Sequence, residues 1–142
     1  MDNKDQKRRQ LIHTMLAQPA GSTATGIAEH NLRPWRALAT HLSPLIGDNG
    51  FGALYGRTAR LQAAQYGWLS TGPSSTSLEK LFQILDEDLR QAEPAVAAEV
   101  NEALLLTLTS LLSELIGEAL TTRLLDAAWG GGLIQKNAGE QK

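Results

Sequence analysis

The sequence predicts an all-α protein, a helical bundle of four to five helices with a long C-terminal helix. The first observation is the segment 94–129, which has no proline after Pro94 and carries a single charge, Glu114, between Ala103 and Ile116. A helix that is apolar around most of its circumference must be covered by other helices or by another chain. The second observation is that apolar residues recur at spacings of three and four in the earlier segments. Both indicate helices packed on helices.

The composition is typical of one globular domain, since 142 residues with 42% apolar and 20% charged residues can bury one core. A formal net charge of -2 gives no general attraction to nucleic acid or to an anionic membrane. The absence of cysteine excludes disulfides and thiolate chemistry. The apolar run at 103–116 is shorter than the roughly 20 residues that span a bilayer. We therefore expect a cytoplasmic protein with no membrane span and no nucleic-acid partner.

The first expected helix begins at a cap formed by Asp2 or Asn3 and runs to about Gln18, where Pro19 ends it. Its apolar stripe consists of Leu11, Ile12, Met15 and Leu16. Its basic residues are Lys4, Lys7, Arg8 and Arg9. Acidic neighbours partly neutralise this cluster, so we interpret it as a solvated helix start, with phosphate contact as the alternative.

The chain divides into three parts at changes of composition. Residues 1–19 form an N-terminal helix or arm, 27–129 a helical bundle domain, and 130–142 a flexible tail without periodicity. The small polar residues between the first two parts predict a flexible connection.

The next expected helix begins around Pro34, because proline is tolerated in a first helical turn. Pro44 removes a backbone donor from this helix and predicts a bend near His41. The sequence Gly-Asp-Asn-Gly at 47–50 predicts a turn, and a further helix follows from Phe51 to about Tyr66.

The segment 70–77 is rich in serine, threonine and glycine and predicts a loop. Thr76 and Glu79 have the spacing of a capping box, in which each side chain satisfies a backbone N–H of the other end. We therefore expect a helix from Leu78 to about Ala92, after which Pro94 begins the long C-terminal helix.

Two apolar seams run along the expected C-terminal helix and predict two neighbouring helices. The first consists of Val100, Leu104, Leu108, Leu111 and Leu115. The second consists of Leu105, Leu112, Ile116, Leu120 and Leu124.

An internal similarity joins residues 42–47, Leu-Ser-Pro-Leu-Ile-Gly, to residues 112–117, Leu-Ser-Glu-Leu-Ile-Gly. Five of six positions are identical at a separation of 70 residues. A duplicated helical unit would explain this similarity, and chance matching of leucine-rich helices is the alternative.

The three histidines, His13, His30 and His41, lie on different expected elements. No pair has the spacing of metal ligands on one helix face, so we predict no metal site and identify no cofactor. The sequence also lacks a Ser-His-Asp grouping, a nucleophile elbow and a phosphate-binding glycine loop. We therefore predict no catalytic residues and a protein that is not an enzyme.

The favoured functional hypothesis is a non-catalytic helical interaction or regulatory module, such as an adaptor or a signalling-associated domain. It would self-associate, as a homodimer for example, and could also bind a protein partner. The expected interface residues are Leu104, Leu108, Leu111, Leu115 and Gly117.

The alternative hypothesis is a helical sensor domain that binds a small ligand or haem. Its pocket would lie between the segment 35–66 and the long helix. Its expected ligand-binding residues are His41, Tyr55, Trp35 and Trp68.

Overall fold

The computed structural model describes residues 3–16, 24–69 and 77–129, and these residues form five helices and no strand. The helices are α1 (Asn3–Leu16), α2 (Ala24–Ala63), α3 (Leu78–Gln91), α4 (Pro94–Ile116) and α5 (Glu118–Trp129). The predicted all-α bundle is confirmed. The tail assigned to 130–142 lies outside the described residues.

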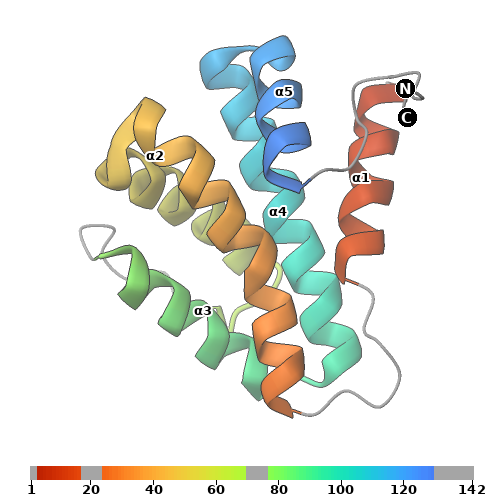
Figure 1. The fold of residues 1–142 in the computed structure, drawn as a ribbon. Helices are drawn as coiled ribbons and strands as arrows, with labels where there is room; N and C mark the ends of the chain where they lie inside the picture. The colour runs from red at the N-terminus through yellow and green to blue at the C-terminus, as the bar shows by residue number, and fades with distance from the viewer. Residues whose placement is uncertain (1–2, 17–23, 70–76, 130–142) are drawn as a thin grey trace.

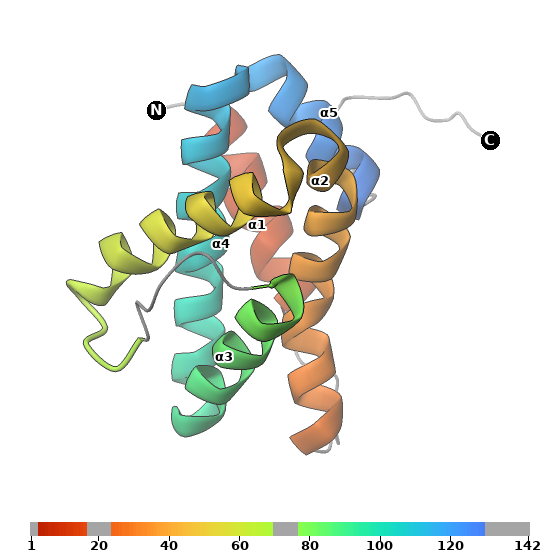
Figure 2. The same ribbon diagram turned by 90° about the vertical axis from the view of Figure 1, so that its left-hand side faces the viewer.

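Helix α4 is the centre of the bundle and packs against each of the other four described helices. Helix α2 crosses its face, and α5 folds back beside both (Figure 1). Helices α1 and α3 lie on opposite flanks, so that a quarter turn of the molecule places α3 in front of α4 and α1 behind it (Figure 2). The two flanking helices therefore cover different sides of the same central layer.

The predicted long C-terminal helix is wrong, because the chain breaks at Gly117 between α4 and α5. This glycine has φ 96° and ψ 152°, a backbone conformation that only glycine adopts without strain. The longest helix is instead α2, whose 40 residues contain one non-helical residue, Gly47.

The other boundaries follow the sequence signals in part. Helix α2 begins at Ala24, so Pro34 lies inside the helix and the predicted start there is wrong. The bend expected near His41 is also displaced, since helical geometry is lost at Gly47, the first residue of the predicted turn. Helix α4 does begin at Pro94.

Helix α3 is capped one residue later than predicted. The Ser77 hydroxyl accepts a hydrogen bond from the Lys80 backbone N–H at 3.2 Å, and Thr76 lies outside the described residues. The helix ends at Gln91, within one residue of the predicted end.

The core is built mainly from one long apolar cluster that all five helices share. The fully buried apolar residues of α4 are Val100, Leu104, Leu105, Leu108 and Leu112, from both predicted seams. The seams are confirmed at these positions, whereas Leu111 is half-buried and Leu115, just before the break at Gly117, is 63% exposed.

Buried amide groups link α2 to α4 within this core. The indole N–H of Trp35 donates to Asn101 Oδ1 at 2.7 Å, and Asn101 Nδ2 donates to the Asn31 carbonyl at 3.0 Å. Because all three residues are buried, these bonds replace water at groups that would otherwise be unsatisfied.

The two similar sequence segments form two similar bends, here called the α2 elbow (residues 42–47) and the α4 elbow (residues 112–117). The final glycine has φ 79° and ψ 162° in the first, and φ 96° and ψ 152° in the second. Among the described residues, Gly47 and Gly117 are the ones with positive φ. Both elbows therefore break a helix in the same way at the same position.

Burial also repeats from one elbow to the other. The first leucine of each, Leu42 and Leu112, is fully buried, and the second, Leu45 and Leu115, is more than half exposed.

The same hydrogen bond closes each elbow. The Ser43 hydroxyl donates to Asp48 Oδ1 at 2.6 Å, and the Ser113 hydroxyl donates to Glu118 Oε1 at 2.7 Å. In both cases the acceptor is the acidic residue directly after the glycine. The two similar sequence segments therefore form the same local structure.

The helices before the elbows correspond as well. Helices α1 and α3 both have 14 residues and both pack chiefly against the central helix of the other unit. Buried side chains recur along each at a spacing of four: Arg8, Ile12 and Leu16 in α1, and Leu81, Leu85 and Leu89 in α3. Asn31 and Asn101, which bond to each other, are also 70 residues apart. The chain thus consists of two like units, α1 with α2, and α3 with α4 and α5.

Helix α4 is long and apolar enough to cross a membrane by length and composition, with a mean hydropathy of 1.4 in its most apolar window. The central helix of a soluble bundle gives the same signal. In this structure 44% of that window is buried within the protein.

Candidate functional site

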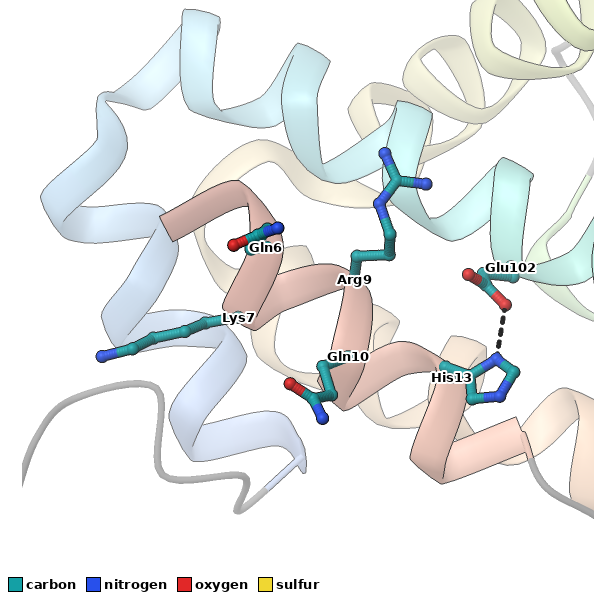
Figure 3. A pocket seen from close by; sticks show the side chains of 6 residues that line it. All are labelled: Gln6, Lys7, Arg9, Gln10, His13 and Glu102. Carbon is teal, nitrogen blue, oxygen red and sulfur yellow. Dashed lines mark hydrogen bonds and ion pairs between the residues drawn. The ribbon is translucent and has the colours of Figure 1, made fainter. Parts of the chain in front are cut away.

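A hollow of about 660 Å³ lies between α1 and the middle of α4. Its lining residues all carry polar or charged groups and come almost entirely from one side of α1 (Figure 3). The lining residues are Gln6, Lys7, Arg9, Gln10, His13 and Glu102.

An exposed histidine and a carboxylate meet at one end of this hollow. The Nδ1 atom of His13 lies 3.1 Å from Glu102 Oε1, and the His13 side chain is 76% exposed. In Figure 3 the Arg9 side chain extends from α1 toward α4, whereas Lys7 points in another direction. The site therefore offers the Arg9 guanidinium, while His13 and Glu102 are engaged with each other.

A second hollow of about 290 Å³ continues the first toward the start of α4 and shares His13 and Glu102 with it. Its other lining residues are mainly apolar: Leu16, Pro94, Ala95, Ala98 and Glu99. Together the two hollows form one groove, here called the α1–α4 groove, with a polar end and an apolar end.

Glu99, at the apolar end, is also engaged. It accepts a hydrogen bond from the Tyr66 hydroxyl at 2.9 Å, and this bond raises the pKa of Tyr66. The two carboxylates of the groove are thus each bonded to a neighbouring side chain.

The opposite side of α1 anchors the helix to the bundle. Arg8 is buried and forms an ion pair with Glu118, which also accepts hydrogen bonds from Ser113 and Thr122. The interpretation of the basic cluster as solvated is therefore wrong for Arg8, although Lys7 and Arg9 are exposed. Of two adjacent cations on α1, Arg8 therefore points into the bundle and Arg9 lines the groove.

The structure brings two of the four predicted ligand-binding residues together. The rings of Trp35 and Tyr55 meet edge to face at 5.3 Å, both buried. Trp68 packs instead against Tyr66, and His41 Nδ1 lies 3.0 Å from the Ala37 carbonyl of its own helix. None of the four lines the α1–α4 groove, and their ligand role stays a prediction.

Tyr55 occupies a markedly apolar position. Burial, with a smaller contribution from the nearby Asp88 carboxylate, raises the pKa of Tyr55 well above its ordinary value of 10.0. The phenol therefore stays protonated over the physiological range.

The predicted interface residues fall into two groups. Leu104 and Leu108 are fully buried within the chain, and Leu111 is half-buried. Leu115 and Gly117, at the α4 elbow, are exposed. The exposed members of the predicted set thus lie at the α4 elbow.

In the ranges that the structure describes, no three histidine, aspartate or glutamate side chains gather closely enough to hold a metal ion. Sequence reasoning missed the pairing of His13 with Glu102, since 89 residues separate them and no motif joins them. The signal that points to the groove is the recurrence of Gln6, Arg9 and His13 along one face of α1.

Comparisons with family models, curated proteins and solved structures find no match to this chain. The surfaces of the molecule itself are therefore the basis for a functional proposal.

Proposed function

We propose that this protein is a non-catalytic helical interaction module, of the adaptor or signalling-associated kind, that self-associates through the α4 elbow. The observation that carries the proposal is a pair of exposed leucines, one on each side of Gly117 in the sequence. Leu115 is 63% exposed and Leu120 is 42% exposed. Large apolar side chains that lie close together on a surface are typical of contact sites between proteins.

A second copy of the chain is the occupant that the fold favours. The two like units of one chain already pack against each other through equivalent positions, as the bond between Asn31 and Asn101 shows. Most soluble oligomers are symmetric assemblies of like surfaces. The α4 elbow and the start of α5 would then meet their copies through Leu115 and Leu120.

The test is the molar mass of the full chain in solution, measured by light scattering over a range of concentrations. We expect a dimer whose dissociation is favoured by Leu115→Ser or Leu120→Ser, since each removes apolar area from the contact. Leu61→Ser is the matched control, because Leu61 is 51% exposed but lies on α2, away from the elbow. A protein that stays monomeric at every soluble concentration, or equal effects of the three substitutions, would contradict the proposal.

A further inference from the structure

We propose that the second copy of the chain contributes its α2 elbow to the contact, so that the α4 elbow of each copy packs against the α2 elbow of the other. This inference rests on the self-association proposed above and identifies the surface that the α4 elbow meets. Leu115 of one copy would lie against Leu45 of the other, and the reverse contact would repeat across a two-fold axis.

The area of a stable contact requires more than the α4 elbow. A stable interface buries about 800 Å² on each partner and involves roughly 20 residues or more of each. Two leucine side chains cannot supply this area by themselves. The exposed large apolar residues in the described part of the chain are Leu45, Leu61, Val96, Leu115 and Leu120. Of these, Leu45 is the one that lies at the other elbow, where it is 53% exposed.

The two elbows lie at the same end of the molecule. In Figures 1 and 2, which differ by a quarter turn about the vertical axis, both elbows are at the upper end of the bundle. One two-fold axis through this end can therefore bring both pairs of elbows into contact at once, and the assembly closes as a dimer. Elbows at opposite ends would instead pair head to tail and continue into a filament.

The local structures of the two elbows present the same apolar side chain. Leu45 and Leu115 each lie two residues before a glycine with positive φ, and both are more than half exposed. Each elbow is closed by the same bond from a serine to an acidic residue. On shape alone, the α4 elbow could therefore meet either the α2 elbow or its own copy.

Charge distinguishes these two pairings. Glu114, next to Leu115, is exposed, so an α4 elbow that packs on its own copy brings two like charges to the contact. The corresponding residue of the α2 elbow is Pro44, which is exposed and uncharged. The carboxylates after the glycines, Asp48 and Glu118, occur once in each elbow and do not favour either pairing. Contact between unlike elbows therefore avoids the repulsion between the two Glu114 side chains.

The first test is the dissociation constant of the dimer formed by Leu45→Ser, measured by light scattering on the full chain. We expect an increase of at least about tenfold, because burial of one leucine side chain contributes this much or more. Leu61→Ser is again the matched control, since Leu61 is exposed to nearly the same extent and lies on the second part of α2. A dimer weakened by Leu115→Ser but not by Leu45→Ser would retain the proposed self-association and overturn this inference.

The second test is cross-linking, which shows which residues meet. The sequence contains no cysteine, so an introduced cysteine has no competing thiol. Leu45→Cys and Leu115→Cys chains, one of them carrying a size tag, are mixed and oxidised mildly. A disulfide forms where the two Cα atoms come within about 7 Å. We expect linked pairs with one chain of each variant, whereas either variant alone, or Leu61→Cys mixed with Leu115→Cys, should stay unlinked.

The outcomes separate this inference from the proposed function. Efficient linking of Leu115→Cys to itself would show that the α4 elbow meets its own copy, and it would overturn the inference alone. A dimer that forms no mixed disulfide would do the same. A chain that stays monomeric at every soluble concentration would overturn both proposals.

Discussion

Two buried polar side chains determine how the flanking and central helices fit together. Asn101 joins α4 to α2 through Trp35 and Asn31, and Arg8 joins α1 to the start of α5 through Glu118. Leucine packing alone tolerates sliding between helices. A buried amide or guanidinium that loses its partner costs about 1–3 kcal/mol or more, so these contacts favour one register over its neighbours.

Tyr55 makes the stability of the protein depend on alkaline pH. Below pH 10 the phenol is protonated in both states and the fold keeps its full stability. Above pH 10 the unfolded chain loses this proton while the buried phenol keeps it, so the free energy of unfolding falls by about 1.4 kcal/mol per pH unit. This loss continues until the pH passes the raised pKa of the folded state.

The measurement is urea unfolding between neutral and alkaline pH in a Tyr66→Phe background, which removes the other tyrosine. We expect this variant to lose stability above pH 10 more steeply than the double variant that also carries Tyr55→Phe. Parallel pH profiles for the two proteins would show that Tyr55 ionises as easily in the folded state as in the unfolded chain.

Apolar residues were the easier part to predict at this scale. Ile12, Leu104 and Leu108 lie at helical spacings and are fully buried. The burial of Arg8 could not be predicted, because its partner Glu118 is 110 residues away and both belong to segments with other exposed charges. Only the packing of α1 against the bundle decides which of three adjacent cations turns inward.

At the scale of the elements, the two elbows are the feature that shapes the bundle. At the α4 elbow α4 ends and α5 folds back, whereas after the α2 elbow the second part of α2 runs at a large angle to the first part and crosses α4 (Figures 1 and 2). Both depend on a glycine with positive φ and ψ near 160°, a region that other residues occupy only with strain.

Gly47→Ala and Gly117→Ala should each destabilise the fold by about 1–3 kcal/mol, the cost of holding a non-glycine residue in this region. No neighbouring atom lies within 4 Å of a Cβ added at either position, so the cost is conformational and not steric. Urea unfolding monitored by circular dichroism gives the two free energies.

Gly67→Ala is the matched control, because an added Cβ there also meets nothing within 4 Å and its φ is not positive. It should be neutral or slightly stabilising, since alanine restricts the unfolded chain. If Gly117→Ala changed the free energy of unfolding as little as Gly67→Ala does, the α4 elbow would not depend on the glycine conformation at Gly117.

The break at Gly117 explains where prediction of the elements failed. A single glycine inside a helix costs about 1 kcal/mol, which a long apolar helix tolerates. The sequence of 94–129 is therefore compatible with one unbroken helix. The similarity to residues 42–47 was the useful signal. There the following Asp-Asn-Gly predicts a turn, and the same turn recurs at Gly117 although Glu-Ala-Leu follows it.

For the whole molecule, the likeness of the two units appears as two central helices and two flanking ones. The first part of α2 and all of α4 are equivalent and bond to each other at their asparagines. Helices α1 and α3 cover opposite flanks (Figure 2). The like units differ most on the flanks, where α1 carries exposed cations and α3 begins with Glu79 and carries Phe82. The α1–α4 groove lies where the two units have diverged.

This arrangement predicts the order in which backbone amides exchange with solvent. Amides of α4 between Val100 and Leu112 should exchange slowest, because α4 packs against all four other described helices and opens only when the bundle unfolds. Residues 30–46 of α2 should match them, since they form the equivalent central helix. Amides of α1 and α3, each covered on one side only, should exchange through smaller openings.

Hydrogen exchange followed by mass spectrometry or NMR at increasing urea concentration distinguishes these classes. Openings of the central helices should depend on urea as steeply as global unfolding does, and those of α1 and α3 less steeply. If α4 instead exchanged by a local opening while α1 stayed protected, the central role of α4 would be wrong. A difference in protection between α4 and residues 30–46 would show that the two like units, although built alike, do not fold as one cooperative body.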